Sequence, residues 1–76
     1  MRVNAVGPGP VDTEALLDSL ADGSYGLSRG AMEATIPVRC LATAAEVADA
    51  VVYLALAQAV TGSVLSIDGG TSATLP

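Results

Sequence analysis

Two short strand-like segments stand near opposite ends of this chain of 76 residues, and a helical region separates them. Residues 2–6 (RVNAV) form the first, and residues 63–67 (SVLSI) form the second, which Asp68-Gly69-Gly70 ends. Strands separated by helices pair in parallel through a right-handed crossover. Because parallel sheets normally have several strands and two covered faces, the sequence predicts an α/β fold at the edge of a larger parallel sheet.

The region after the first strand predicts a loop and two short helical segments. Gly7-Pro8-Gly9-Pro10 should stop the strand abruptly and force an irregular loop. Thr13 then precedes a short helix over residues 14–20, whose three leucines (Leu16, Leu17 and Leu20) share one face. Residues 22–30 hold three glycines and two serines and predict a mobile loop, which residues 31–35 follow with one or two helical turns.

The clearest element is a long helix over residues 44–57. Thr43 and Glu46 have the spacing of a capping box, with a hydroxyl at the N-cap and a carboxylate three residues later. The helix carries an apolar stripe that neighbouring apolar residues widen, which predicts two buried faces and hence a partner. The stripe is Val47, Val51, Leu54 and Ala55, and the residues that widen it are Ala48, Val52 and Leu56. Residues 71–76 are expected to form a loose tail.

Composition and charge exclude several classes of ligand. Three arginines and no lysine stand against eight carboxylates, for a net charge of −5, so there is no basic stripe for nucleic acid or an anionic membrane. The longest apolar stretch, residues 47–60, is too short to span a bilayer. A single cysteine and no histidine leave no thiolate or imidazole metal site. We expect Cys40 to be a small buried side chain and the protein to be cytoplasmic.

Five short motifs occur in an order and spacing that resemble the short-chain dehydrogenase/reductase family. They cover residues 2–70 and are RVNAVGPGPVDT, Ile36-Pro37-Val38-Arg39, Glu46-Val47-Ala48, Val60-Thr61-Gly62 and Asp68-Gly69-Gly70. The resemblance implies that residues 1–76 are a partial domain, the C-terminal fragment of a Rossmann-type doubly wound parallel sheet. It also implies an oxidoreductase that uses NAD or NADP and acts on an alcohol/carbonyl pair.

The same resemblance assigns roles within the chain. Pro8, Gly9, Val11 and Thr13 would lie beside the nicotinamide and pyrophosphate of the cofactor. Residues 14–36 would form the substrate-loop region, and the helix 44–57 with the strand 63–67 would contact another subunit of a homo-oligomer. These roles are physically reasonable, because a glycine lets the backbone approach a ligand and open α/β sheets bind ligands at the carboxyl ends of their strands.

The family's catalytic machinery is not found in this sequence. The glycine-rich phosphate loop is missing, and the Tyr-x-x-x-Lys pair is missing because the chain has no lysine. Neither Tyr25 nor Tyr53 can take over the tyrosine's role. We therefore assign no catalytic residue and expect the chain alone to be inactive. The alternative interpretations are a truncated, non-catalytic interaction module and a gene-prediction fragment with no independent activity.

Three of the four candidate site residues also have a structural explanation. Thr13 can simply be the N-cap of the helix that follows it, and Asp12 could be that cap instead. Pro8 and Gly9 can simply turn the chain. Asn4, a polar residue within the first strand segment, is expected to be a structural hydrogen-bonding residue.

Overall fold

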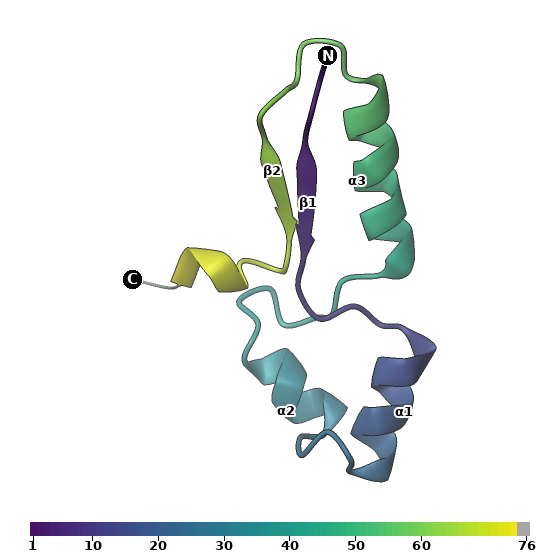
Figure 1. Cartoon of the computed structure of the whole chain (residues 1–76). Helices are drawn as coiled ribbons and strands as arrows, with labels where there is room; N and C mark the ends of the chain where they lie inside the picture. The colour runs from purple at the N-terminus through teal and green to yellow at the C-terminus, as the bar shows by residue number, and fades with distance from the viewer. Residues whose placement is uncertain (75–76) are drawn as a thin grey trace.

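The computed structural model describes residues 1–74 and consists of a two-stranded parallel sheet with helices. The elements in chain order are β1 (Ala5–Pro8), α1 (Glu14–Asp22), α2 (Arg29–Ala34), α3 (Ala44–Leu56), β2 (Val64–Ile67) and the 3₁₀ helix η1 (Thr71–Thr74). The strands pair in parallel from Ala5 opposite Val64 to Pro8 opposite Ile67. Figure 1 shows α3 alongside the sheet, whereas α1 and α2 form a separate pair beyond the carboxyl ends of the strands. The predicted α/β architecture is confirmed.

The first strand begins and ends later than predicted. It covers Ala5–Pro8 instead of residues 2–6, so the prediction that Gly7 and Pro8 stop it was wrong. The amide nitrogens of Ala5 and Gly9 donate to the carbonyls of Ser63 (2.9 Å) and Ile67 (3.1 Å) in and before β2. Because successive residues of a strand face opposite edges, the nitrogen of Pro8 lies on the edge away from β2. Its missing N–H therefore removes no bond from the sheet.

α1 begins where the sequence indicates and runs two residues beyond the predicted end, to Asp22. The Thr13 hydroxyl oxygen accepts a hydrogen bond from the Leu16 N–H at 3.3 Å, which is the geometry of an N-cap. Gly23 ends the helix in the left-handed conformation, with φ of 81°. The alternative in which Thr13 caps the helix is confirmed.

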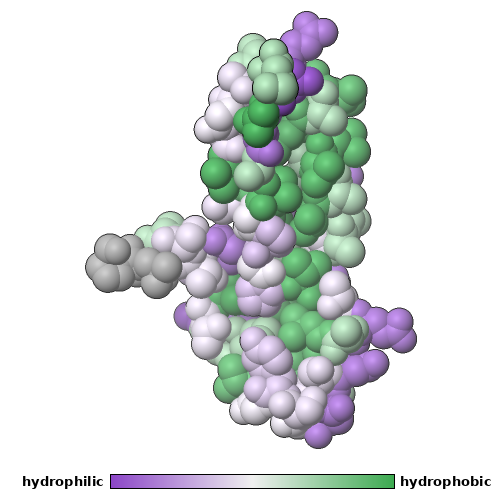
Figure 2. Space-filling model, viewed as in Figure 1, coloured by the Kyte–Doolittle hydropathy of each residue, from purple (hydrophilic) through white to green (hydrophobic). Residues whose placement is uncertain are grey.

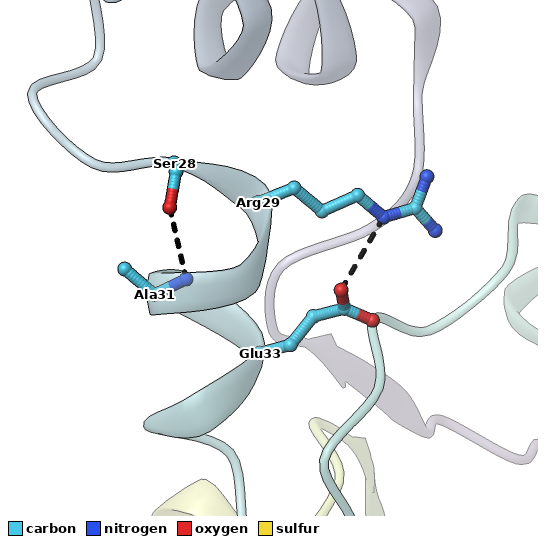
Figure 3. A network of polar contacts seen from close by, with 4 residues as sticks. All are labelled: Ser28, Arg29, Ala31 and Glu33. Carbon is cyan, nitrogen blue, oxygen red and sulfur yellow. Dashed lines mark hydrogen bonds and ion pairs between the residues drawn. The ribbon is translucent and has the colours of Figure 1, made fainter.

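α2 begins at Arg29, inside the stretch that was predicted to be a loop. Ser28 is its N-cap, with the hydroxyl oxygen accepting from the Ala31 N–H at 3.1 Å (Figure 3). Arg29 and Glu33 form an exposed ion pair one turn apart, with 3.5 Å between Nε and Oε1. Such a pair contributes little to stability, so the cap is the stronger local signal for this start.

α3 has a capped end on each side. The predicted capping box is confirmed: the Thr43 hydroxyl accepts from the Glu46 N–H, and the Glu46 carboxylate accepts from the Thr43 N–H, both at 3.0 Å. At the other end the Arg2 guanidinium donates to three carbonyl oxygens that have no partner within the helix. These carbonyls belong to Leu54, Ala55 and Ala57, at 2.8, 2.8 and 2.9 Å. This contact was not predicted from the sequence.

The second strand is one residue shorter than predicted, and an ordered turn follows it. Residues Thr71–Thr74 form η1, so the expected loose tail is wrong for them, while residues 75–76 of that prediction lie outside the described part. Asn4 confirms its expected role, because its side chain donates to the Val60 carbonyl at 3.0 Å and accepts from the Ser63 N–H at 3.1 Å. It fixes the start of β1 against the turn that precedes β2.

The hydrophobic core lies between α1 and α2 and does not lie under the sheet. Its buried members are Leu20, Met32, Ile36 and Leu41, with Leu16 and Leu17 packed against them, so the predicted leucine face is confirmed. The radius of gyration is 14.3 Å, whereas a compact chain of this length would have about 11 Å. The molecule is therefore elongated, with a helical unit at one end and a thinly covered sheet at the other.

Two predictions about burial were wrong. α3 buries one face only: Leu54 is buried, whereas Val52 and Leu56 on the far side are 55% and 74% exposed. Apolar side chains accordingly gather on the surface of the sheet end of the molecule (Figure 2). Cys40 is exposed instead of buried, because it follows a tight surface turn in which Arg39 has a φ of 63° and donates its N–H to the Ile36 carbonyl.

Candidate functional site

The segment from Pro8 to Thr13, called the 8–13 loop below, leaves the carboxyl end of β1 and leads into α1. It contains all of the candidate site residues. The Gly9 N–H bonds to the end of β2, as described above. Further along, the Asp12 N–H donates to the Ala42 carbonyl at 2.9 Å, and the Ala42 N–H donates to the Pro10 carbonyl at 3.1 Å. The loop is therefore held from both sides by backbone hydrogen bonds.

Residue 9 packs so closely against the backbone after β2 that it has to be a glycine. A Cβ atom on Gly9 would lie 2.7 Å from the Cβ of Asp68 and 2.9 Å from its Cα. Carbon atoms in contact prefer about 3.5–4.0 Å, so no larger residue fits without movement of the chain. This contact gives Gly9 a structural role that is independent of any ligand.

Val11 and Thr13 present two hydrogen-bond donors on the same short segment. Within residues 1–74, no hydrogen bond uses the Val11 N–H, and none uses the proton of the Thr13 hydroxyl. The Thr13 N–H donates to the Val11 carbonyl at 2.7 Å, which closes a tight turn between the two residues. Thr13 is exposed and Val11 is half-buried. Both donors therefore lie on one tight turn.

The Asp12 side chain bonds to the start of α3, not to the start of α1 as the sequence allowed. Its Oδ1 accepts from the Ala44 N–H at 3.2 Å, at the first residue of α3. The alternative in which Asp12 caps the helix after it is therefore wrong. The carboxylate at this helix N-terminus is favourable to the helix dipole and fastens the 8–13 loop to α3.

The Asp68 carboxylate next to Gly9 is fixed by the turn in which it lies. It accepts from the N–H groups of Gly70 and Ser72, both at 3.0 Å. A hydrogen bond from the Ser72 side chain foremost, and then those from the backbone N–H groups of Ser72 and Gly70, hold the pKa of Asp68 below its ordinary value of 3.8. Asp68 thus stays ionised at neutral pH and anchors the start of η1.

A cleft of about 290 Å³ lies elsewhere, between β1 and α3, and no residue of the 8–13 loop lines it. Its lining residues are Arg2, Asn4, Ala5, Val6, Val51, Leu54 and Ala55. Tyr25 and Tyr53 are both exposed, the first between α1 and α2 and the second on α3. The sequence-predicted site residues therefore lie together in one loop at the carboxyl end of the sheet, separate from this cleft.

The part of the chain that the structure describes has neither a metal-binding cluster nor a membrane-spanning helix. Residues 1–74 contain no cluster of three or more Asp, Glu, His or Cys side chains that could hold a metal ion. They also contain no helix with the length and hydrophobicity needed to cross a membrane.

Comparison with known proteins places the chain in a family. Residues 1–72 match the family model described as enoyl-(acyl carrier protein) reductase. The chain is 41% identical over 75 residues to cis-4-hydroxycyclohexanecarboxylate dehydrogenase of Sinomonas cyclohexanicum, covering 96% of this chain and 28% of that protein. It is 32% identical over 72 residues to an uncharacterized oxidoreductase of Caenorhabditis elegans, covering 92% of this chain and 23% of the other. The chain thus spans less than a third of either curated relative.

Solved structures agree with this placement. The protein ElxO with NADP bound superposes with a TM-score of 0.83 at 35% identity, over 96% of this chain and 29% of ElxO. A short-chain dehydrogenase family protein from Francisella tularensis superposes with a TM-score of 0.77 at 33% identity, over 96% of this chain and 34% of that one. The chain belongs to the short-chain dehydrogenase/reductase family and corresponds to the C-terminal segment of its Rossmann-type fold.

Proposed function

We propose that this chain is part of an NAD(P)-dependent oxidoreductase acting on an alcohol/carbonyl pair, in which the 8–13 loop forms part of the nicotinamide pocket. The observation that carries the proposal is a pair of donors, the Val11 N–H and the Thr13 hydroxyl, that no hydrogen bond within residues 1–74 uses and that lie on a loop held at the carboxyl end of β1. Open α/β sheets bind their ligands at this end. The similarity to ElxO, a structure that contains NADP, supports the same cofactor class.

The residues of the loop fit a nicotinamide cofactor. Its carboxamide and phosphate oxygens are acceptors, and they suit donors as close together as Val11 and Thr13. Pro8 and Gly9 set the position of the loop, since Gly9 brings it against the end of β2. The cofactor, when bound, supplies the hydride chemistry, and the contribution of this chain is to bind and orient it.

The acid/base group of the reaction has to come from outside these 76 residues, which contain no lysine and no Tyr-x-x-x-Lys pair. In this proposal the chain is a partial Rossmann-type domain, and α1, α2 and the loop between them (residues 14–36) border the substrate. We expect the purified chain to oxidise no alcohol with NAD or NADP. Turnover above a buffer blank that is lost on mutation of a residue in this chain would contradict this assignment.

The same proposal includes a homo-oligomer formed through the predicted helix 44–57 and strand 63–67, which correspond to α3 and β2. Val52 and Leu56 on α3 are exposed, and Val64 on β2 is 71% exposed. One edge of β2 lacks a partner strand within residues 1–74, and unpaired strand edges invite pairing. A two-fold axis would bring identical apolar surfaces together. The acidic chain with its free Cys40 also suits the cytoplasm.

The second candidate is a non-catalytic interaction module, which the exposed apolar face of α3 and the lack of a catalytic lysine favour. The coding sequence directly upstream of Met1 distinguishes the two functions. An in-frame stretch that encodes Tyr-x-x-x-Lys supports the oxidoreductase, whereas a stop codon close to Met1 supports the module.

Thr13→Ala tests the cofactor pocket in the whole protein, with this segment joined to the rest of the sheet. Loss of one hydrogen bond should weaken NAD(P)H binding by about 2- to 10-fold, measured by fluorescence titration. Ser28→Ala is the matched control, because it removes the N-cap of α2 in the same way but lies outside the 8–13 loop. Thr13→Ser, which keeps the hydroxyl, should bind like wild type. Equal affinity in Thr13→Ala and wild type would leave Thr13 as a helix cap only.

A further inference from the structure

We propose that the turn Asp68–Gly70 positions the substrate-loop region against the 8–13 loop, so that Gly69 and Gly70 are positioning residues of the site. The inference rests on the proposed function for the roles of these two regions. Its basis is that one turn of three residues contacts both of them. From the sequence, Asp68-Gly69-Gly70 was predicted to end a strand and was one motif of the family resemblance, with no positioning role.

The first contact joins the turn to the chain that leaves α2. The Val38 N–H donates to the Gly69 carbonyl at 3.1 Å. A Cβ on Gly69 would overlap the Cγ2 of Ile36 and lie 2.8 Å from the Cγ2 of Val38, and φ of Gly69 is +66°. A Cβ on Gly70 would lie 3.3 Å from the Cβ of Pro37. The residues 36–38 therefore lie directly on the two glycines.

Ile36 carries this contact into the helical unit. It is the most buried of the core residues, with 2% of its surface exposed, and it packs with Leu20 of α1 and Met32 of α2. Packed cores transmit displacement because they contain few voids that could absorb it. A shift of the turn at Gly69 would therefore move α1 and α2 as a unit.

The second contact joins the same turn to the 8–13 loop. Asp68 lies against Gly9 so closely that no Cβ fits between them, as shown above. The Asp68 carboxylate also accepts from Gly70 and Ser72, which fixes the turn relative to the atoms that touch Gly9. In addition to the chain connection from Thr13 into α1, three residues at the end of β2 thus link the 8–13 loop to the far end of the substrate-loop region at Ile36.

The experiment compares Gly69→Ala with Gly62→Ala in the whole protein by hydrogen exchange. Gly62 has a φ of +73°, close to that of Gly69, but a Cβ there meets no atom within 4 Å. Both variants place alanine in a left-handed backbone, and only Gly69→Ala pushes against Ile36 and Val38. We expect exchange in residues 14–36 to become roughly tenfold faster in Gly69→Ala and to stay unchanged in Gly62→Ala. Equal acceleration in both variants, or in neither, overturns the proposal.

Kinetics separate positioning from a general loss of structure. Gly69→Ala should raise KM for the alcohol about 5- to 10-fold while kcat and cofactor affinity change less than about twofold. If kcat and cofactor affinity fall as strongly as KM rises, the turn has only a structural role and the proposal is overturned. If Gly69→Ala does not fold, Val38→Ala removes one partner of the contact without strain and must accelerate exchange in residues 14–36. Wild-type protein that binds no cofactor would count against the proposed function, whereas the exchange comparison would still stand.

Discussion

Replacing Gly9 by alanine tests the close approach between the 8–13 loop and the end of β2. Gly9 does not have the positive φ that would make alanine strained in itself. The added methyl group is therefore the only change of consequence. It would lie 2.7 and 2.9 Å from the Cβ and Cα of Asp68.

The magnitude follows from these distances. Both contacts are about 1 Å shorter than the preferred separation of two carbon atoms. Neither atom of Asp68 is the far end of a flexible side chain, and hydrogen bonds from Gly9 to Ile67 and from Gly70 and Ser72 to Asp68 resist movement. Overpacking of this kind costs about 1–3 kcal/mol of the free energy of unfolding.

Gly7→Ala, two residues earlier in β1, is the matched control. A Cβ on Gly7 would lie 3.9 Å from the Cγ1 of Val64, which is ordinary contact. Alanine there should be neutral or should stabilise by about 0.4–1 kcal/mol, because it restricts the unfolded chain. The free energies of unfolding of the two variants should therefore differ by about 1–4 kcal/mol.

Urea titration followed by circular dichroism measures this difference. The protein concentration must be the same for all variants, since association shifts apparent stability. Two variants of equal stability would refute the close approach of Gly9 to Asp68. That result would also remove the contact through which the turn is proposed to fix the 8–13 loop.

Two further predictions concern association and pH. Val52→Asp should lower the mass measured by sedimentation at micromolar concentration, because it puts a charge on the exposed apolar face of α3. The control Gln58→Asp, which lies beyond the helix, should leave the mass unchanged. A monomeric wild type would contradict the proposed oligomer. The pKa of Asp68 is lowered by hydrogen bonds in the folded protein, so its stabilising effect is complete above the unfolded value of 3.8 and is lost as the pH falls through the lower folded value. The stability difference between wild type and Asp68→Asn, measured by urea titration at about pH 5 and about pH 2, should therefore shrink at the lower pH, and a constant difference would contradict this.

The features predicted correctly from the sequence are those that depend on neighbours in the chain. The capping box of α3 joins residues three apart, and the leucine face of α1 follows from helical periodicity. The missed features join distant residues. Arg2 bonds to the end of α3 across more than fifty residues, and Asp12 bonds to its start across 32. No local pattern identifies either pairing.

In the candidate site, too, the features that were missed depend on contacts between distant residues. Pro8, Gly9, Val11 and Thr13 were selected by resemblance, and their roles in cofactor binding stay predictions. The structure adds that Gly9 is fixed by Asp68, from the far end of the chain. It also adds that the Val11 N–H is unused within residues 1–74, which depends on how the loop pairs with Ala42.

The position of Pro8 connects the sheet to the site. β1 uses one edge to pair with β2, and along its other edge Val6 offers an N–H whereas Pro8 offers none. A strand added on that edge can therefore bond to Val6 but loses its next donor at Pro8, where the 8–13 loop begins. On that edge β1 therefore donates no hydrogen bond beyond Val6, although the Pro8 carbonyl can still accept one. The proline that was predicted to break the strand instead lies within β1, and it ends N–H donation on the second edge just before the loop that carries Val11 and Thr13.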